Sequence, residues 1–299
     1  MAAEGLKSTC HCRRVVLKIT LSWDSADDAL KCQCYPCRRH HTSAFVCYMR
    51  ASKCRVAVYR GSDSIVKVAS SCEREGNVAR WCCSCCSSKL LTECDDGSYM
   101  VNLAPIIEDT IPQPIATKWR GQLQQEDEDG TVAAWYNSFP ERGKNKNKLD
   151  KPPSTDTCWT GSCSCGTSRY EIDIRRVTQL QHCYCHLCRE LSGSAFMTWC
   201  PMDKSCFRWV RSESIKLVRT TDFGRRHICS KCHGVLTIVY DSQPGLVWPC
   251  AGSLDDDSLP AMKEEMGKYL SRVCHICCRH SPTWLRIPDD GMERLEDAC

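Results

Sequence analysis

The sequence has no long apolar run and no strong excess of charge of either sign. No window of its 299 residues approaches the roughly 18 consecutive apolar positions that a membrane-spanning helix needs. Forty Lys and Arg residues against 36 Asp and Glu residues leave a net charge of only +4, which is too mixed to indicate a nucleic-acid partner. We therefore expect no membrane partner, and the composition does not support nucleic-acid binding.

The start of the sequence also lacks the features of a secretory signal peptide, since Glu4 is acidic and no apolar core follows Lys7. We expect a cytoplasmic or nuclear protein, in a reducing compartment where disulfides are rare. Hydrophobic residues at 42% and charged residues at 25% are close to the averages of globular chains, which excludes wholesale disorder. The length suits two domains of about 150 residues each.

Cysteine is the residue in excess, with 28 in the chain. In a reducing compartment, cysteines at CxC and CxxC spacing are more often ligands of a soft metal than partners in disulfides, so zinc is the first candidate. A CxC pair, a CxCxxC triplet and a CxxC pair occur twice in this order, which predicts two related domains. The first copy comprises Cys10, Cys12, Cys32, Cys34, Cys37, Cys83 and Cys86, and the second comprises Cys163, Cys165, Cys183, Cys185, Cys188, Cys229 and Cys232.

The segment between the copies differs from them in composition. It contains an acidic run at 126–129 and two consecutive prolines at 152–153, which is typical of a linker. We predict one domain at 1–120 and another at 158–299, joined by a linker at 121–157.

Several segments near the cysteines alternate in polarity or are rich in β-branched residues. Residues 15–21, 54–59, 168–174 and 236–240 have this pattern and are predicted to be strands. Residues 259–270 instead place apolar side chains at helical spacing. We predict a mainly β fold with few short helices, in which short strands are joined by turns that carry the cysteines.

The number of thiols distinguishes two kinds of metal site in each copy. The two pairs together supply four thiolates, enough for a closed, structural zinc site. The triplet supplies three, with no fourth cysteine at a regular distance, and three protein ligands are typical of catalytic zinc. Zinc that carries three thiolates is a weak Lewis acid, but it can bind and deprotonate an incoming thiol. The triplets therefore favour reactions that make or break a carbon–sulfur bond.

Further residues around the second copy indicate a family. They are Gly161-Ser-Cys163-Ser-Cys165-Gly166, Cys183-Tyr-Cys185-His-Leu-Cys188-Arg189, Ser192-Gly193, Phe196, Cys229-Ser-Lys-Cys232 and Gly252-Ser-Leu254-Asp255-Asp256. With these residues the second copy resembles the glutathione-dependent formaldehyde-activating enzyme family, which also includes centromere protein V.

The resemblance implies a fold of small coiled β-sheets with two zinc ions per domain, up to four per chain. The cysteine pairs would hold a structural zinc. Cys183, Cys185 and Cys188 would hold the catalytic zinc, at which glutathione and formaldehyde combine to S-(hydroxymethyl)glutathione.

The first copy departs from the family pattern. Arg13 and Ser87 replace glycines, and residues 102–105 stand where the family has Gly-x-Leu-Asp. All seven cysteines remain, so we expect metal binding to be kept, while the loss of the glycines is expected to change the local shape.

Two functions remain open at this point. The first is a zinc-dependent carbon–sulfur lyase or thiol-adduct enzyme with glutathione or a similar thiol as substrate. The alternative is a non-enzymatic zinc module for protein or chromatin association. Arg189, Arg225 and Arg226 are candidate clamps for substrate carboxylates, and His186 is a candidate proton shuttle.

The cysteines outside the repeated pattern are predicted to have other roles. Those in apolar or strand-like surroundings are expected to be core residues, namely Cys47, Cys54, Cys72, Cys94, Cys200, Cys206 and Cys250. Cys274, Cys277 and Cys278 lie near His280, and this group could form a further zinc site.

Overall fold

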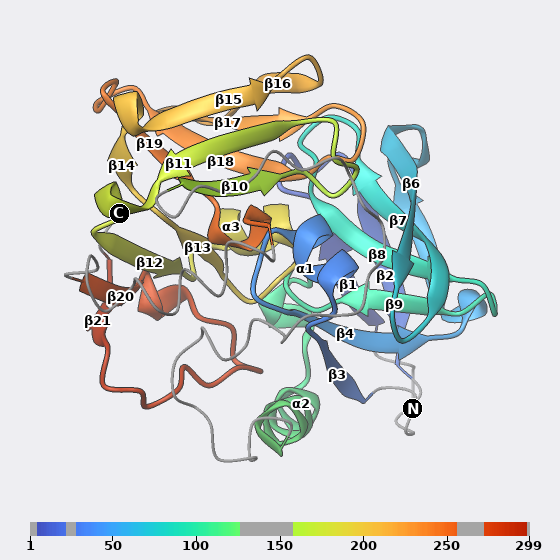
Figure 1. Cartoon of the computed structure of the whole chain (residues 1–299). Coiled ribbons are helices and arrows are strands. Elements are labelled where there is room, and N and C mark those ends of the chain that lie inside the picture. The colour runs from blue at the N-terminus through green and yellow to red at the C-terminus, as the bar shows by residue number, and fades with distance from the viewer. Residues whose placement is uncertain (1–4, 22–27, 126–157, 256–271, 298–299) are drawn as a thin grey trace.

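The computed structural model describes residues 5–21, 28–125, 158–255 and 272–297, in which strands are the main regular element (Figure 1). The mainly β prediction is confirmed. The predicted strands are also confirmed, with 15–21 containing β2, 54–59 overlapping β5, 168–174 containing β11 and 236–240 falling within β18. The predicted helix at 259–270 lies outside the described residues.

The first repeat consists of two antiparallel sheets. A three-stranded sheet has the order β1-β2-β5, and a six-stranded sheet has the order β3-β4-β9-β8-β7-β6. The strands are β1 (Gly5–Thr9), β2 (Val16–Thr20), β3 (Ala29–Cys32), β4 (Val46–Ala51), β5 (Val56–Arg60), β6 (Ile65–Cys72), β7 (Gly76–Cys83), β8 (Lys89–Cys94) and β9 (Tyr99–Asn102). The helices are α1 (Tyr35–His41) and α2 (Gln113–Gln125).

The second repeat has sheets of order β10-β11-β15, β14-β19-β18-β17-β16 and β13-β12-β20-β21. Its strands are β10 (Cys158–Ser162), β11 (Arg169–Asp173), β12 (Gln179–Cys183), β13 (Met197–Trp199), β14 (Met202–Asp203), β15 (Phe207–Arg211), β16 (Ile215–Thr221), β17 (Gly224–Cys229), β18 (Val235–Tyr240), β19 (Leu246–Pro249), β20 (Arg272–Ile276) and β21 (Glu293–Leu295). Helix α3 (His186–Ser192) follows β12. The β12–β20 and β20–β21 pairs are parallel.

The predicted domain limits, 1–120 and 158–299, remain predictions. Helix α2 continues to Gln125, so its last turn lies in the segment predicted to be a linker. The rest of that segment lies outside the described residues.

The two repeats pack directly against each other through α1 and α3, which lie near the centre of the molecule in Figure 1. Arg38, on α1, donates hydrogen bonds to the backbone carbonyls of Gly252 (3.2 Å) and Leu254 (3.1 Å). A Cβ atom at Gly252 would collide with the backbone of Thr42 and Ser43, so this close approach requires glycine. One hydrophobic core contains buried residues of both repeats.

A buried carboxylate connects the same elements. Asp255 pairs with Arg39 of α1 (3.1 Å) and with Arg169 of β11 (2.8 Å), and all three side chains are buried. The two guanidinium groups, together with hydrogen bonds from Thr160 and Ser162, hold the pKa of Asp255 below its ordinary value although burial acts to raise it. The Asp of the family motif is therefore a structural partner of α1 in this chain.

Candidate metal centres

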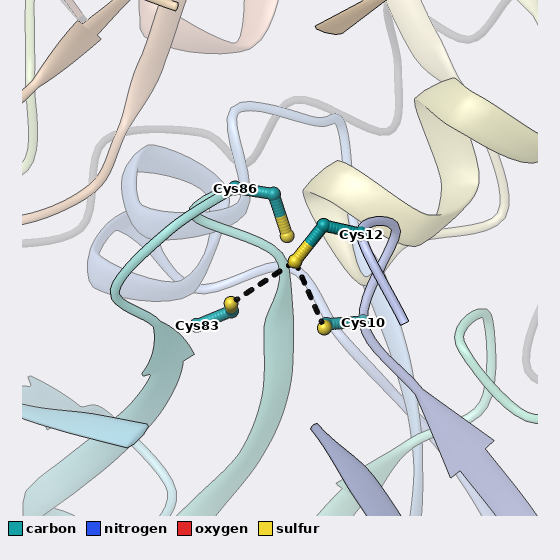
Figure 2. Close-up of side chains that lie close together, drawn as sticks. All are labelled: Cys10, Cys12, Cys83 and Cys86. Atoms are coloured by element: carbon teal, nitrogen blue, oxygen red, sulfur yellow. Dashed lines mark hydrogen bonds between the residues drawn. The ribbon is translucent and has the colours of Figure 1, made fainter. Parts of the chain in front are cut away.

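The CxC and CxxC pairs lie on tight turns between neighbouring strands. In the first repeat, Cys10 and Cys12 lie between β1 and β2, and Cys83 and Cys86 lie at the β7–β8 turn. Figure 2 shows the four side chains converging, with Sγ separations of 3.5 Å for Cys10–Cys12 and 3.7 Å for Cys12–Cys83. Sulfur atoms bound tetrahedrally at about 2.3 Å from zinc are about 3.8 Å apart, whereas a disulfide measures about 2.05 Å. The group has the dimensions of a four-thiolate metal site.

The second repeat brings its two pairs together in the same way. Cys163, Cys165, Cys229 and Cys232 have all their Sγ atoms within 4.8 Å of one another. The Cys163–Cys165 and Cys165–Cys229 separations are 3.5 and 3.8 Å. In each repeat the four cysteines of the CxC and CxxC pairs, called the pair cysteines below, thus lie together as the sequence predicted. Each of these two groups could hold a metal ion.

The glycine replacements in the first repeat do not change the shape of these turns. Arg13 has a φ of 62°, close to the 72° of its counterpart Gly166, and Ser87 has a φ of 65°, close to the 60° of its counterpart His233. The backbone N–H groups of Arg13 and Ser87 donate to the carbonyls of Cys10 (2.9 Å) and Cys83 (2.8 Å). The left-handed conformation costs about 1–3 kcal/mol at a residue other than glycine. The turns are therefore kept at a cost in strain, and the expected change in local shape does not occur at these two positions.

Each triplet lies where a strand leads into a helix. Cys183 ends β12, Cys185 is the N-cap of α3 and Cys188 lies in the first helical turn, where its N–H donates to Cys185 Sγ (3.4 Å). Their three Sγ atoms are within 4.8 Å of one another. Cys32, Cys34 and Cys37 occupy the same places at the end of β3 and the start of α1.

The sequence analysis missed a fourth thiol in the first repeat. Cys72, which we expected to be a core residue, places its Sγ 3.9 Å from Cys32, 3.9 Å from Cys34 and 3.7 Å from Cys37. All four Sγ atoms lie within 4.8 Å of one another. The only sequence signal was a cysteine at 72 without a counterpart in the second copy.

The second triplet has a different neighbour. Cys277 contacts the thiol of Cys185, because the parallel β12–β20 pairing places Ile276 opposite Cys183 and so sets the next residue beside the triplet. Within the described segments, however, no fourth metal-binding side chain has its ligand atom within 4.8 Å of all three Sγ atoms. Cys274 and His280 likewise form no metal-binding group there, so the further zinc site considered from the sequence is not assembled.

A buried arginine lies beside the third cysteine of each triplet. Arg80 donates to Cys37 Sγ (3.3 Å), and Arg226 lies 3.9 Å from Cys188 Sγ. Both arginines are almost fully buried. A buried guanidinium is costly unless it is paired with negative charge, so each arginine favours the thiolate form of the sulfur beside it.

Hydrogen bonds between the thiols of a triplet lower the pKa of one sulfur and raise that of a neighbour, so that the pKa of Cys32 and of Cys188 lies above its ordinary value. Those from Cys183, Cys188 and Cys277 hold the pKa of Cys185 well below its ordinary value, although burial raises it. In the first repeat, those from Cys32, Cys34 and Cys72, with a smaller contribution from Arg80, lower the pKa of Cys37.

The three candidate clamps for substrate carboxylates already have protein partners. Arg189 pairs with Glu108 (3.1 Å), Arg225 pairs with Asp241 (2.9 Å), and Arg226 lies against the Cys188 sulfur. His186 contacts the Arg189 guanidinium (3.0 Å), and burial, followed by Arg189, lowers its pKa. Its role as a proton shuttle remains a prediction.

The fold and its cysteine groups define a mainly β protein made of two related repeats, each able to hold metal ions on clustered thiols. The sequence profile of the family described as glutathione-dependent formaldehyde-activating enzyme matches residues 5–122 and, a second time, residues 158–272. The chain therefore belongs to this family, with its domain present twice, as the resemblance predicted.

The other comparisons add little. No curated protein matches the chain significantly. A crystal structure of a Rhodobacter sphaeroides protein is similar at 25% identity, covering 36% of this chain and 94% of that one with a TM-score of 0.29. Within the parts of the chain that the structure describes, no helix is long and apolar enough to cross a membrane.

Proposed function

We propose that the chain is a zinc-dependent carbon–sulfur lyase that joins glutathione, or a similar thiol, to formaldehyde or another small electrophile. Its reaction centre would be the second triplet, Cys183, Cys185 and Cys188. The observation that supports this assignment is the difference in thiol number: the second triplet has three mutually close thiols, whereas the first has four. Three protein ligands leave a position for substrate, and four do not.

The residues present suit zinc, since clustered cysteine thiolates are its preferred soft ligands. The two groups of pair cysteines and the two triplets would hold up to four ions. Zinc bound at the second triplet would supply an open position that favours the deprotonated form of an incoming thiol.

The protein's own residues would prepare this position. Cys183 and Cys188 are buried and Cys185 is partly exposed, so the side of the group on which Cys185 lies is the one open to solvent. Arg226 offsets negative charge beside Cys188. In the reaction the substrate sulfur attacks the aldehyde carbon and a C–S bond forms. The carbonyl π electrons move to oxygen, and the proton lost from the thiol is finally placed on that oxygen.

The non-enzymatic zinc module remains the second candidate, and one observation favours it. Cys277 contacts Cys185, so its thiol is close enough to compete for the open position. If Cys277 fills that position permanently, the second centre is closed and no exogenous thiol can enter.

Glutathione titrations distinguish the two functions. We expect millimolar glutathione to change the zinc-edge X-ray absorption spectrum of the wild-type protein and to give S-(hydroxymethyl)glutathione from formaldehyde faster than buffer does, measured by NMR. Cys185→Ser should abolish both effects, whereas Cys206→Ser, which changes a partly buried cysteine outside the metal groups, should abolish neither.

Cys277→Ala provides the decisive arm of this test. The enzyme function predicts that wild-type protein and Cys277→Ala both respond to glutathione. A wild-type protein that does not respond to glutathione, together with a Cys277→Ala variant that does, would contradict the enzyme function and support the closed zinc module.

A further inference from the structure

We propose that Cys72 converts the first triplet into a closed, four-cysteine structural metal site, and that this site fixes helix α1 against the second repeat. The proposal concerns the first repeat and does not depend on turnover at the second. The cluster consists of Cys32, Cys34, Cys37 and Cys72 and is called the closed triplet below.

The dimensions of the closed triplet are those of a tetrahedral thiolate site. The three separations from Cys72 Sγ are between 3.7 and 3.9 Å, and Cys32–Cys34 is 3.5 Å. The expected edge for zinc is about 3.8 Å. A cysteine that merely filled a hydrophobic core would have no reason to be nearly equidistant from three other sulfurs.

The fourth thiol comes from a difference in hairpin length. In the first repeat β6 and β7 each have 8 residues, and their last pair is Cys72 with Gly76. In the second repeat β16 and β17 have 7 and 6 residues, and the last pair is Thr221 with Gly224. The longer hairpin carries a cysteine to the triplet, and the shorter one ends in a residue without a thiol.

The surroundings of the closed triplet indicate negative charge on the sulfurs. Arg80, with no exposed surface, donates to Cys37 Sγ at 3.3 Å, and the Tyr48 hydroxyl lies 3.4 Å from the same sulfur. Four neutral thiols would leave this guanidinium buried without a counter-charge, which is strongly unfavourable. Four thiolates around a divalent ion carry a net charge of −2 and give the buried cation a partner.

The closed triplet has a structural consequence beyond metal binding. It joins the β6–β7 hairpin to the first turn of α1, and the next two residues of that helix are Arg38 and Arg39. These side chains hold the 252–255 segment of the second repeat, through two carbonyls and through Asp255. A metal at the closed triplet would therefore keep both arginines in place.

The test compares Cys72→Ala with Cys94→Ala. Both cysteines are buried in the same small hydrophobic cluster, but Cys94 belongs to none of the metal-binding groups among the described residues. We expect Cys72→Ala to release one zinc per chain to a chromogenic chelator at least about tenfold faster than wild type, since even outer partners of metal ligands change affinity by about 10–100-fold. Cys94→Ala should release zinc as wild type does. Equal release from both variants would overturn the proposal.

A second measurement uses the wild-type chain in case Cys72→Ala does not fold. In protein loaded with ¹¹³Cd, scalar coupling between the metal and cysteine Cβ protons identifies the ligands directly. We expect the Cβ protons of Cys32, Cys34, Cys37 and Cys72 to couple to one cadmium ion. Coupling to Cys32, Cys34 and Cys37 without Cys72 would overturn the proposal, whatever happens at the second triplet.

Discussion

The two triplets show how one cysteine motif can have two different surroundings. Both place their three thiols at the end of a strand and the start of a helix, beside a buried arginine. They differ in a residue outside the motif: Cys72 is close to all three thiols of the first triplet, while Cys277 contacts Cys185 in the second. The motif alone therefore does not decide whether such a site is open, because the surrounding strands supply or withhold the fourth thiol.

The repeats differ in the number of thiols at their triplets, but they are joined in structure. Each triplet helix packs on the other repeat: α1 holds the 252–255 segment, and Glu190 of α3 pairs with Arg13 (2.8 Å), which follows Cys12. The first repeat thus supports the second even if it performs no reaction itself.

The largest expected effect comes from the group of four pair cysteines in the second repeat. Cys229→Ser removes one of the four pair thiols, and structural zinc supplies folding free energy directly, about 10–16 kcal/mol in small zinc domains. We expect this variant to unfold or aggregate, whereas Cys185→Ser in the three-thiol group stays folded. Circular dichroism melting curves and zinc content measure the difference. Normal melting and full zinc content in Cys229→Ser would show that the pairs are not a structural site.

The buried carboxylate at the junction of the repeats should have the next largest effect. Asp255→Asn leaves Arg39 and Arg169 without their counter-charge, and breaking a buried ion pair costs about 3–5 kcal/mol. Asp241→Asn is the matched control, because Asp241 is a surface partner of Arg219 and such pairs contribute about 0–1 kcal/mol. Urea unfolding measures both. Equal effects would mean that the junction does not stabilise the protein.

The same junction has a dependence on pH. The pKa of Asp255 is lowered in the folded protein, so the stability that the carboxylate contributes is present above its unfolded pKa of about 3.9. That contribution is lost as the pH falls through the folded value. Both the unfolded pKa of about 3.9 and the lower folded pKa lie well below pH 6. The difference in unfolding free energy between wild type and Asp255→Asn should therefore be constant from pH 6 to pH 8. A difference that changes across this range would point to another titrating group.

A smaller effect is expected at Gly252, where the backbones of the two repeats lie close together. Gly252→Ala forces a methyl group into the backbone of Thr42 and Ser43 and should cost about 1–3 kcal/mol, the usual range for overpacking. Gly245→Ala is the control, because no atom lies within 4 Å of the position its Cβ would take. Thermal melting of the two variants should differ. A shared melting temperature would show that the contact can relax without cost.

Much of this architecture could be predicted from the sequence, because short-range patterns determine it. Alternation predicted the strands, and the doubled spacing predicted which thiols lie together in both groups of pair cysteines. Cys72 was missed because its position depends on the length of one hairpin. Cys277 was not linked to the triplet because parallel pairing of β12 with β20 leaves no local signature. Contacts between the repeats, such as Arg39 with Asp255, depend on packing that no spacing encodes.

The central claim, that one triplet is closed and the other open, is tested most directly by adding glutathione to the ¹¹³Cd-loaded wild-type protein. Ligand couplings assign each cadmium signal to its cysteines. We expect the signal coupled to Cys183, Cys185 and Cys188 to shift on addition of glutathione, and the signal of the closed triplet to stay unchanged. A shift of the closed-triplet signal, or no shift at the second triplet, would contradict the account.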